Sequence, residues 1–455
     1  MSKQKLKIAL LGGGSLYFEG VLGEIAVTPE LDGAELVLFD IDAKRMELIR
    51  RVGVRVVEKT RAKLKIKSTL ELAEALDGAN FAIASIGVHG PDASWHKADS
   101  DIAAKLGIIQ TTGDTVGLSG LSQGLRIVPI FVHIARQMEK YCPDAVLMNH
   151  SNPMAVICRA VTKYSRIKTI GYCHNVASDL RFIARILELD HQDLEAVFAG
   201  PNHCVWMWGL KYRGRDIFPQ FKQRLMDALR DKSGTPLPPR PDGTGRSLDE
   251  HRFAAEMLEL FDVFPIGGDR HIIEFFPHAR RATDTKKIPY GLQWRSDIIS
   301  DNMIKREISN EPDDIVLKAS GKKPVYIPEI LSPEAMGQQI RSMMFGPERI
   351  HVVNIPNRGA VPNLPEWAVV ELQATIGMTG ARPIYVGNLP PQAARWSLAQ
   401  IYAHELTLDA AVEGSRSKAL MALACDPMIQ NFDEARRGLD AIVKVHGSRM
   451  KAFRA

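Results

Sequence analysis

The sequence predicts an α/β protein built on a doubly wound, mostly parallel β-sheet, with a second domain of mixed α and β structure. Short apolar runs alternate with amphipathic helical patterns through residues 1–200, and repeated βα units of this kind form parallel sheets. Residues 201–455 lack that regular alternation. They contain a segment rich in Pro, Gly and Ser at 231–247, which we expect to be an exposed loop. A length of 455 residues also suits two domains.

The spacing of apolar residues locates each expected element. Continuous or alternating apolar runs predict strands, and apolar residues at helical spacing predict helices. Strands are expected at 6–11, 35–40, 63–68, 81–87, 145–149, 167–171 and 194–198. Helices are expected at 15–27, 43–59, 69–76 and 122–141. Later, extended segments are expected at 206–212 and 213–218, and helices at 248–260, 332–344 and 390–412. The carboxyl ends of the parallel strands should meet at one edge, where ligands bind in open α/β sheets.

Composition and charge exclude several classes of protein. Apolar residues make up 45% and charged residues 24%, which excludes a disordered, coiled-coil or collagen-like chain. The net charge of +5 is spread over scattered basic residues, so we expect neither a nucleic-acid partner nor a membrane partner. No apolar run reaches the roughly 20 residues of a membrane helix. The first five residues leave no room for a signal peptide, so we expect a cytoplasmic protein.

A glycine-rich loop at the end of the first strand predicts dinucleotide binding. Gly12, Gly14 and Ser15 precede a helix, and glycines there let the backbone approach a pyrophosphate at the helix N-terminus. Tyr17 replaces the third glycine of the usual pattern. Asp40 ends the second strand, where a carboxylate accepts hydrogen bonds from the adenosine ribose and favours NAD over NADP. Asp40 could instead cap the following helix. Residues 1–200 are therefore the expected NAD-binding domain.

Polar segments follow four further expected strands or loops. Cys173 and His203 each lie just after an apolar run, and a thiolate with an imidazole could hold a divalent transition metal and leave positions open for substrate. The alternative is a pair of buried structural residues. Asn152 follows another strand, as a polar contact or as the cap of a helix that Pro153 begins. Asp114 lies in a polar glycine loop that could equally be a surface turn. Five cysteines, an odd number, argue against a disulfide framework.

Together these segments resemble glycoside hydrolase family 4. The resemblance covers nearly the whole chain in order, through the glycine loop with Asp40 and the segments GDTVG (113–117), LRIVPI (125–130), NHSNPM (149–154), GYCHN (171–175), PNH (201–203), NIPNRGAVPNLP (354–365), IYVGNLPPQ (384–392) and CDPM (425–428). It implies a Rossmann-like fold similar to lactate and malate dehydrogenases. It also implies hydrolysis of a glycoside with NAD⁺ and a divalent metal, usually manganese, an exception among glycosidases.

The resemblance implies a redox-neutral reaction. Hydride leaves C3 of the sugar, the C2 proton becomes acidic and is removed, the glycosidic oxygen departs, water adds, and the hydride returns. Residues 201–455 would then supply most of the catalytic and oligomerisation surfaces, and the protein would be a homodimer or homotetramer. The roles that the resemblance implies are metal ligands for Cys173 and His203, an acid that assists the leaving group for His174, sugar contacts for Asn152 and Asp114, and a place beside the metal for Asn202.

Departures from the family pattern leave the C2 base open. His150 stands where many members have a tyrosine before Thr-Asn-Pro, and Phe275 stands where many have a tyrosine thought to deprotonate C2. Asp269 and His271 are the candidate bases. The alternative for both is a structural loop in which Arg270 forms salt bridges.

The segment 268–277 resembles that of the bacterial α-galacturonidases in the family. A hexuronide carries a carboxylate, which a guanidinium can bind through two hydrogen bonds. Arg270 is the first candidate and Arg126 the second, although both could pair with protein carboxylates. We therefore expect an α-galacturonide or another hexuronide as substrate.

Three alternatives stay open. The substrate could be a glucoside, a galactoside or a 6-phospho-glycoside of the same family. The protein could be a plain NAD-dependent 2-hydroxy acid dehydrogenase, which would accumulate NADH. It could also be a non-catalytic dinucleotide sensor, although such a protein has no need for polar residues clustered at the strand ends.

Overall fold

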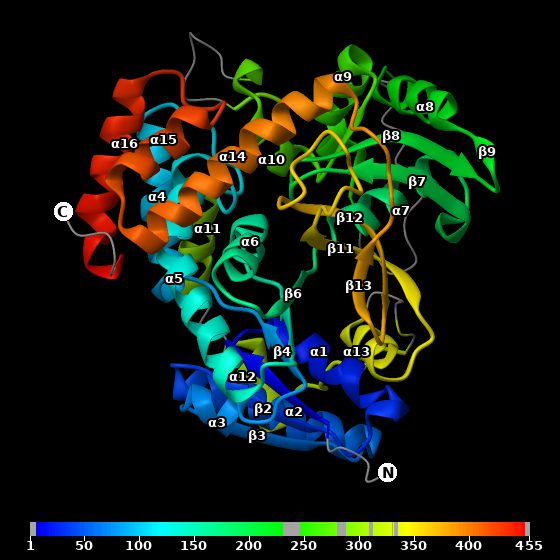
Figure 1. The fold of residues 1–455 in the computed structure, drawn as a ribbon, viewed down its shortest axis with the longest axis vertical. Helices are drawn as coiled ribbons and strands as arrows, with labels where there is room; N and C mark the ends of the chain where they lie inside the picture. The colour runs from blue at the N-terminus through cyan, green and yellow to red at the C-terminus, as the bar shows by residue number, and fades with distance from the viewer. Residues whose placement is uncertain are drawn as a thin grey trace.

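The computed structural model places two β-sheets among sixteen α-helices over the residues it describes, which are 6–230, 246–279, 288–308, 313–329, 331 and 335–450. Most of the expected loop at 231–247 lies outside these residues, so that prediction stays a prediction. Figure 1 shows helices α15 and α16 grouped with α4 and α11 on one side of the molecule, away from strands β7 to β9.

Nine strands form the large sheet in the order β13-β12-β11-β6-β5-β4-β1-β2-β3. Its parallel strands are β1 (Lys7–Leu11), β2 (Glu35–Phe39), β3 (Lys65–Thr69), β4 (Phe81–Ala84), β5 (Val146–Asn149) and β6 (Lys168–Gly171). Their order, β3-β2-β1-β4-β5-β6, reverses direction between β1 and β4, and it is that of a doubly wound dinucleotide-binding sheet. The predicted fold class is confirmed.

Three antiparallel strands from late in the chain extend this sheet beyond β6. They are β11 (Arg349–Pro356), β12 (Val369–Gly377) and β13 (Gly380–Pro383). Asn354 of β11 pairs with Gly171 of β6. The sequence analysis did not predict these strands, and they show that segments assigned to the second domain complete the sheet of the first.

The second sheet is smaller and antiparallel. It contains β7 (Leu194–Ala199), β8 (Val205–Tyr212), β9 (Arg215–Asp216) and β10 (Phe264–Ile266), with β10 and β7 on either side of β8 and β9 paired to β8. The strand expected at 194–198 therefore exists but does not continue the parallel series, because the turn at 200–204 folds it into a hairpin with β8. The extended segment expected at 213–218 contains only β9.

Helices connect the strands and cover both faces of the large sheet. They are α1 (Tyr17–Ala26), α2 (Ala43–Thr60), α3 (Leu72–Leu76), α4 (Ser94–Lys105), α5 (Gly117–Tyr141), α6 (Met154–Tyr164), α7 (Asn175–Leu187), α8 (Phe218–Arg230), α9 (Arg252–Phe261), α10 (Asp269–Ile272), α11 (Arg295–Ile308), α12 (Asp314–Ser320), α13 (Met336–Phe345), α14 (Pro391–Glu413), α15 (Arg416–Cys425) and α16 (Phe432–His446). By length and composition α5 could cross a membrane, but 78% of its most apolar stretch is buried within the protein, as in a core helix.

Candidate active site

A cavity of about 660 Å³ opens where the sequence analysis expected ligands, at the carboxyl ends of the parallel strands. Eight residues with predicted catalytic, substrate or metal roles line it: Asp114, Asn152, Cys173, His174, His203, Asp269, Arg270 and His271. They come from five separate segments of the chain. Ser85, at the end of β4, also lines the cavity, and its hydroxyl lies 2.9 Å from that of Ser15 in the glycine loop. The cavity therefore adjoins the expected dinucleotide site.

The glycine loop is held tightly against the ends of β2 and β4. The N–H groups of Gly12 and Gly13 both donate to the carbonyl oxygen of Phe39, at 2.9 and 2.8 Å. Gly12 has a φ of +82°, and a Cβ there would collide with the carbonyl oxygen of Ser85. This position therefore needs glycine both for its conformation and for the close approach of two backbones.

Asp40 links the loop to the second strand. Its Oδ2 accepts the N–H of Gly14 at 2.8 Å, and its Oδ1 accepts the N–H of Asp42 at 2.9 Å. Asp42, and not Asp40, caps α2, because its carboxylate accepts the N–H groups of Lys44 and Arg45. The helix-cap alternative for Asp40 is wrong.

Tyr17, which replaces the third glycine, points toward the cavity and explains this departure from the usual pattern. Its hydroxyl lies 2.9 Å from Nε2 of His150, and the His150 ring stacks on that of Tyr172 at 5.2 Å between centroids. Burial lowers the pKa of His150 to about 3, so the imidazole is neutral at physiological pH. The sequence analysis did not predict a site role for any of these three residues. The tyrosine in a glycine position was the available signal.

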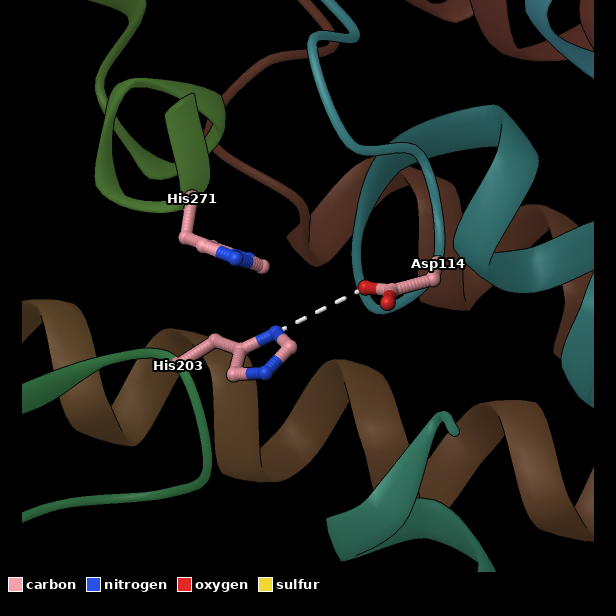
Figure 2. Close-up of side chains that lie close together, drawn as sticks. All are labelled: Asp114, His203 and His271. Atoms are coloured by element: carbon pink, nitrogen blue, oxygen red, sulfur yellow. Dashed lines mark ion pairs between the residues drawn. The ribbon is translucent and has the colours of Figure 1, made fainter. Parts of the chain in front are cut away.

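Asp114, His203 and His271 bring their ligand atoms within 4.8 Å of one another (Figure 2). The dashed line in Figure 2 joins Nδ1 of His203 to Oδ1 of Asp114, at 3.5 Å. Asp114 lies in the loop before α5, His203 lies in the turn between β7 and β8, and His271 belongs to α10. The rings of the two histidines are 4.4 Å apart between centroids. The surface-turn alternative for Asp114 is wrong, because its side chain points into this cluster.

Cys173 lines the same cavity and forms a hydrogen bond with His203. Burial by itself lowers the pKa of His203, but the carboxylate of Asp114 and a hydrogen bond with Cys173 outweigh it and raise the pKa to about 10. Burial by itself raises the pKa of Asp114, but the positive charge of His203 and a hydrogen bond with it hold that pKa far below its ordinary value. A carboxylate, a thiol and two imidazoles in one place are a donor set that fits a divalent transition metal.

Asn152 extends the polar surface from Asp114. Its Nδ2 donates to Oδ2 of Asp114 at 2.9 Å, whereas its buried Oδ1 has no hydrogen-bond partner among the described residues. It does not cap the next helix, because α6 begins at Met154 with Pro153 in the cap position. The alternative in which Asn152 caps this helix and Pro153 is its first residue is therefore wrong.

Two residues with predicted site roles, Asn202 and Asp269, are buried and hydrogen-bonded to other parts of the protein. Asn202 is fully buried, does not line the cavity, and donates from Nδ2 to Oε2 of Glu371 at 2.7 Å. Asp269 is also fully buried, and its carboxylate accepts the N–H groups of Phe253 and Ala254 at the start of α9, at 2.7 and 2.9 Å. Direct contact with a substrate is therefore not open to Asn202, and both oxygens of Asp269 already serve the α9 N-terminus.

The two candidate arginines differ in environment. Arg126 is buried and donates to Asp99 at 2.7 Å, so the protein-carboxylate alternative is correct for it. Arg270 is exposed and lines the cavity, and its guanidinium makes no ion pair with any residue in the described part of the chain. Arg246, which the sequence analysis missed, also lines the cavity and donates to Asp179 and Asn175 at 2.6 and 2.7 Å.

His174 is the residue directly before α7 and lies at the edge of the cavity. Its side chain keeps contact with solvent. Partial removal of the ring from water, followed by the positive charge of Arg246, lowers the pKa of His174. Phe275, by contrast, is 1% exposed and belongs to the hydrophobic core, so the position of the usual family tyrosine does not face the cavity in this protein.

Comparisons with known proteins agree with the resemblance in the motifs. The model described as "Family 4 glycosyl hydrolase" matches residues 7–189, and "Family 4 glycosyl hydrolase C-terminal domain" matches residues 198–429. An alpha-galactosidase of Bacillus subtilis is 28% identical over 442 residues, covering 92% of this chain and 93% of the relative. An alpha-galacturonidase of Lachnoclostridium phytofermentans is 29% identical over 448 residues, covering 94% and 92%.

Solved structures show the same fold over almost the full length. The crystal structure of lplD from Bacillus subtilis matches with a TM-score of 0.81 and 27% identity, over 96% of this chain and 99% of the other. A 6-phospho-alpha-glucosidase from gut microorganisms, solved in complex with NAD and Mn²⁺, matches with a TM-score of 0.80 and 24% identity, over 98% and 99%. Because the two family models together span most of its length, this chain belongs to family 4 of the glycosyl hydrolases and is a glycosidase.

Proposed function

We propose that the protein hydrolyses the α-glycoside of a hexuronic acid, with an α-galacturonide as the first choice, and that it uses NAD and a divalent cation, Mn²⁺ first. One observation carries the choice of substrate. Arg270 faces the cavity with no carboxylate partner among the described residues. A guanidinium without a partner beside a substrate cavity favours an anionic ligand. An alpha-galacturonidase is among the relatives that match nearly the whole chain.

The glycine loop supports the NAD part of the proposal. Gly12 provides a left-handed turn with no room for a side chain, and a Cβ on the buried Gly14 would crowd Arg45 and the carboxylate of Asp40. Each oxygen of Asp40 accepts one backbone N–H, which leaves acceptor capacity for ribose hydroxyls. Gly12, Gly14, Ser15 and Asp40 are thus the residues that would hold the dinucleotide, with its pyrophosphate at the start of α1.

The possible ligand atoms around His203 support the proposal that the protein binds a divalent cation. We assign Cys173 and His203 as ligands, as the motifs suggest, and add Asp114, whose carboxylate points at the same imidazole. When bound, NAD supplies reversible hydride transfer at a sugar carbon, and the cation polarises the oxygen on that carbon.

The protein's own side chains then move protons and orient the sugar. Asn152, with Oδ1 unpaired, would accept a hydrogen bond from a sugar hydroxyl beside Asp114. His174 would give a proton to the departing glycosidic oxygen. Of the two candidate bases, His271 has a buried Nδ1 with no partner among the described residues, whereas Asp269 serves the α9 N-terminus. We therefore propose His271 as the base that takes the C2 proton.

A substitution separates the two possible roles of His271. If it is the base, His271→Gln should bind Mn²⁺ with the affinity of the wild type while the rate of C2 proton exchange falls by about 10² to 10⁴. If His271 is instead a third or fourth metal ligand, the same variant should lose Mn²⁺ affinity and exchange together.

A kinetic comparison tests the substrate. Arg270→Ala should lower kcat/KM for a nitrophenyl α-galacturonide by about 10² to 10³, because it leaves the substrate carboxylate without a partner. It should affect a neutral α-galactoside far less. Arg270→Lys should recover only part of the loss, since an ammonium cannot form the two-pronged contact. Arg166→Ala, at an arginine 96% exposed and outside the cavity, is the matched control.

Preference of the wild type for the neutral sugar, or an equal fall for both substrates in Arg270→Ala, would show that the uronide assignment is wrong. The same panel should contain a 6-phospho-glycoside and a glucoside, the family alternatives. A cytoplasmic location and assembly into a homodimer or homotetramer stay predictions, which cell fractionation and light scattering can check.

A further inference from the structure

One buried carboxylate joins the loop that carries Asp114 to the helical segment that carries His271. The N–H groups of Thr111, Thr112 and Gly113 all donate to a single oxygen of Glu274, at 2.5, 2.6 and 2.9 Å. Glu274 is 2% exposed. Consecutive N–H groups that converge on one point form an anion-binding nest, and here the protein fills that nest with its own carboxylate.

Further hydrogen bonds hold the same loop from its other sides. The carbonyl oxygen of Arg270 accepts the hydroxyl groups of Thr111 and Thr112, the second at 3.0 Å. Nε2 of Gln123 donates to the carbonyl oxygen of Gly113 at 2.6 Å. Backbone groups and two hydroxyl groups of this loop thus form hydrogen bonds with α5 and with the segment 270–274. The loop therefore has little freedom to change its conformation.

The nest lies directly before a residue of the cluster in Figure 2. Asp114 follows Gly113, and His271 precedes Glu274 by less than one helical turn. Glu274 does not line the cavity. It nevertheless fixes the spacing between two of the three cluster residues, because each is on one of the two segments that it ties together.

We infer that Glu274 is a positioning residue that sets the metal affinity of the cluster by holding Asp114 toward His203. This inference rests on the proposed function, in which Asp114 helps to hold the cation. Without the carboxylate, three buried N–H groups lose their acceptor, which is costly in a desolvated place. The loop would turn those groups toward water and carry Asp114 away from His203.

The direct test is Mn²⁺ binding, measured from the electron paramagnetic resonance signal of the free ion. Glu274→Ala should bind Mn²⁺ about 10 to 100 times more weakly than the wild type, the usual effect of losing a partner of a metal ligand. NAD binding, measured by calorimetry, should stay within about twofold, because the glycine loop makes no contact with the nest. Added formate should restore Mn²⁺ affinity by filling the nest, whereas chloride at the same ionic strength should not.

Two further variants keep the test decisive. Glu24→Ala removes another carboxylate that accepts a backbone N–H, that of Met336 at 2.8 Å, but it neither lines the cavity nor contacts the loop before Asp114, so Mn²⁺ affinity should not change. Glu274→Gln has nearly the wild-type shape and should fold even if Glu274→Ala does not. It should bind Mn²⁺ more weakly than the wild type, because a neutral oxygen is a poorer acceptor for three donors.

The outcomes are distinguishable. If Glu274→Gln folds, as judged by circular dichroism, and binds Mn²⁺ like the wild type, the inference is overturned while the metal proposal stands. If the wild type binds no Mn²⁺, the metal proposal and this inference fail together. Weaker binding in the Glu274 variants, with formate rescue of Glu274→Ala and no change in Glu24→Ala, supports the inference.

Discussion

Asp426 should make the protein less stable as the pH rises, and the structure gives the size of the effect. Its Oδ2 accepts the N–H of Gly117, the first residue of α5, at 2.7 Å, and its Oδ1 accepts the N–H of Met428 at 2.9 Å. Burial outweighs these hydrogen bonds and raises the pKa of Asp426 from 3.8 to about 6. At 1.36 kcal/mol per pH unit, this difference corresponds to about 3 kcal/mol.

The sign follows from proton binding. The folded protein holds this proton more tightly than the unfolded chain, so the stabilisation from protonated Asp426 is complete below pH 3.8 and is lost as the pH rises to about 6. Asp426→Asn cannot titrate. The free energy of unfolding of the variant, minus that of the wild type, should therefore rise by about 2 kcal/mol between pH 4.5 and pH 7.

Urea unfolding of both proteins across this range, followed by circular dichroism, measures the effect. Taking the difference between the two proteins cancels the titration of the other carboxylates. Asp301→Asn, at an exposed carboxylate, controls for the change of residue type. A constant difference for Asp426→Asn, or one that falls as the pH rises, would refute the reasoning.

Four other outcomes can be checked separately. Cys173→Ser should lose Mn²⁺ binding and activity while NAD binding persists, and chelated wild type should recover with Mn²⁺; full activity in metal-free enzyme, verified by elemental analysis, would contradict the proposal. Hydrolysis in D₂O should place deuterium at C2 of the released sugar, with C3 label retained, whereas steady NADH accumulation would favour a dehydrogenase. Gly12→Ala should abolish NAD binding measured by calorimetry, because its Cβ meets the carbonyl of Ser85; normal binding would remove the glycine loop from the site. Arg126→Ala should lower the free energy of unfolding by about 3 to 5 kcal/mol, because it takes the guanidinium away from buried Asp99 and leaves that carboxylate to Ser122 and His446, and a loss below 1 kcal/mol in urea unfolding would argue otherwise.

The parallel part of the fold could be predicted because its information is local. The strands from β1 to β6 are short and mostly apolar, with the polar β3 as the exception, and each connecting helix has its own period, so the order of elements gives the sheet class. Strands β11 and β12 are largely apolar and β13 is the short segment GARP, but the place of all three in this sheet depends on a contact between residues 171 and 354. No local pattern encodes such a contact, so these strands could not be assigned to the first sheet.

The candidate site also has features that could be predicted from the sequence and features that could not. Segments at strand ends were found because strands align their carboxyl ends, and most of the named side chains line one cavity. The distances among Asp114, His203 and His271 arise from three separate segments, so their grouping was not visible in the sequence. The hydrogen bonds of Asp269 with the N-terminus of α9 could not be predicted, because the position of that helix depends on tertiary packing.

The addition of β11 beside β6 has a consequence for the chain while it is being synthesised. Strand β6 leaves the ribosome long before β11, its neighbour on that side, has been made. At ordinary elongation rates this interval is roughly 10 to 40 s, during which the edge of β6 presents unpaired backbone groups to other nascent chains. A nascent chain paused between the two strands should bind chaperones that cap exposed edges. Conversely, the fragment 1–200 should be prone to aggregate when made alone and should be protected when the rest of the chain is supplied in trans.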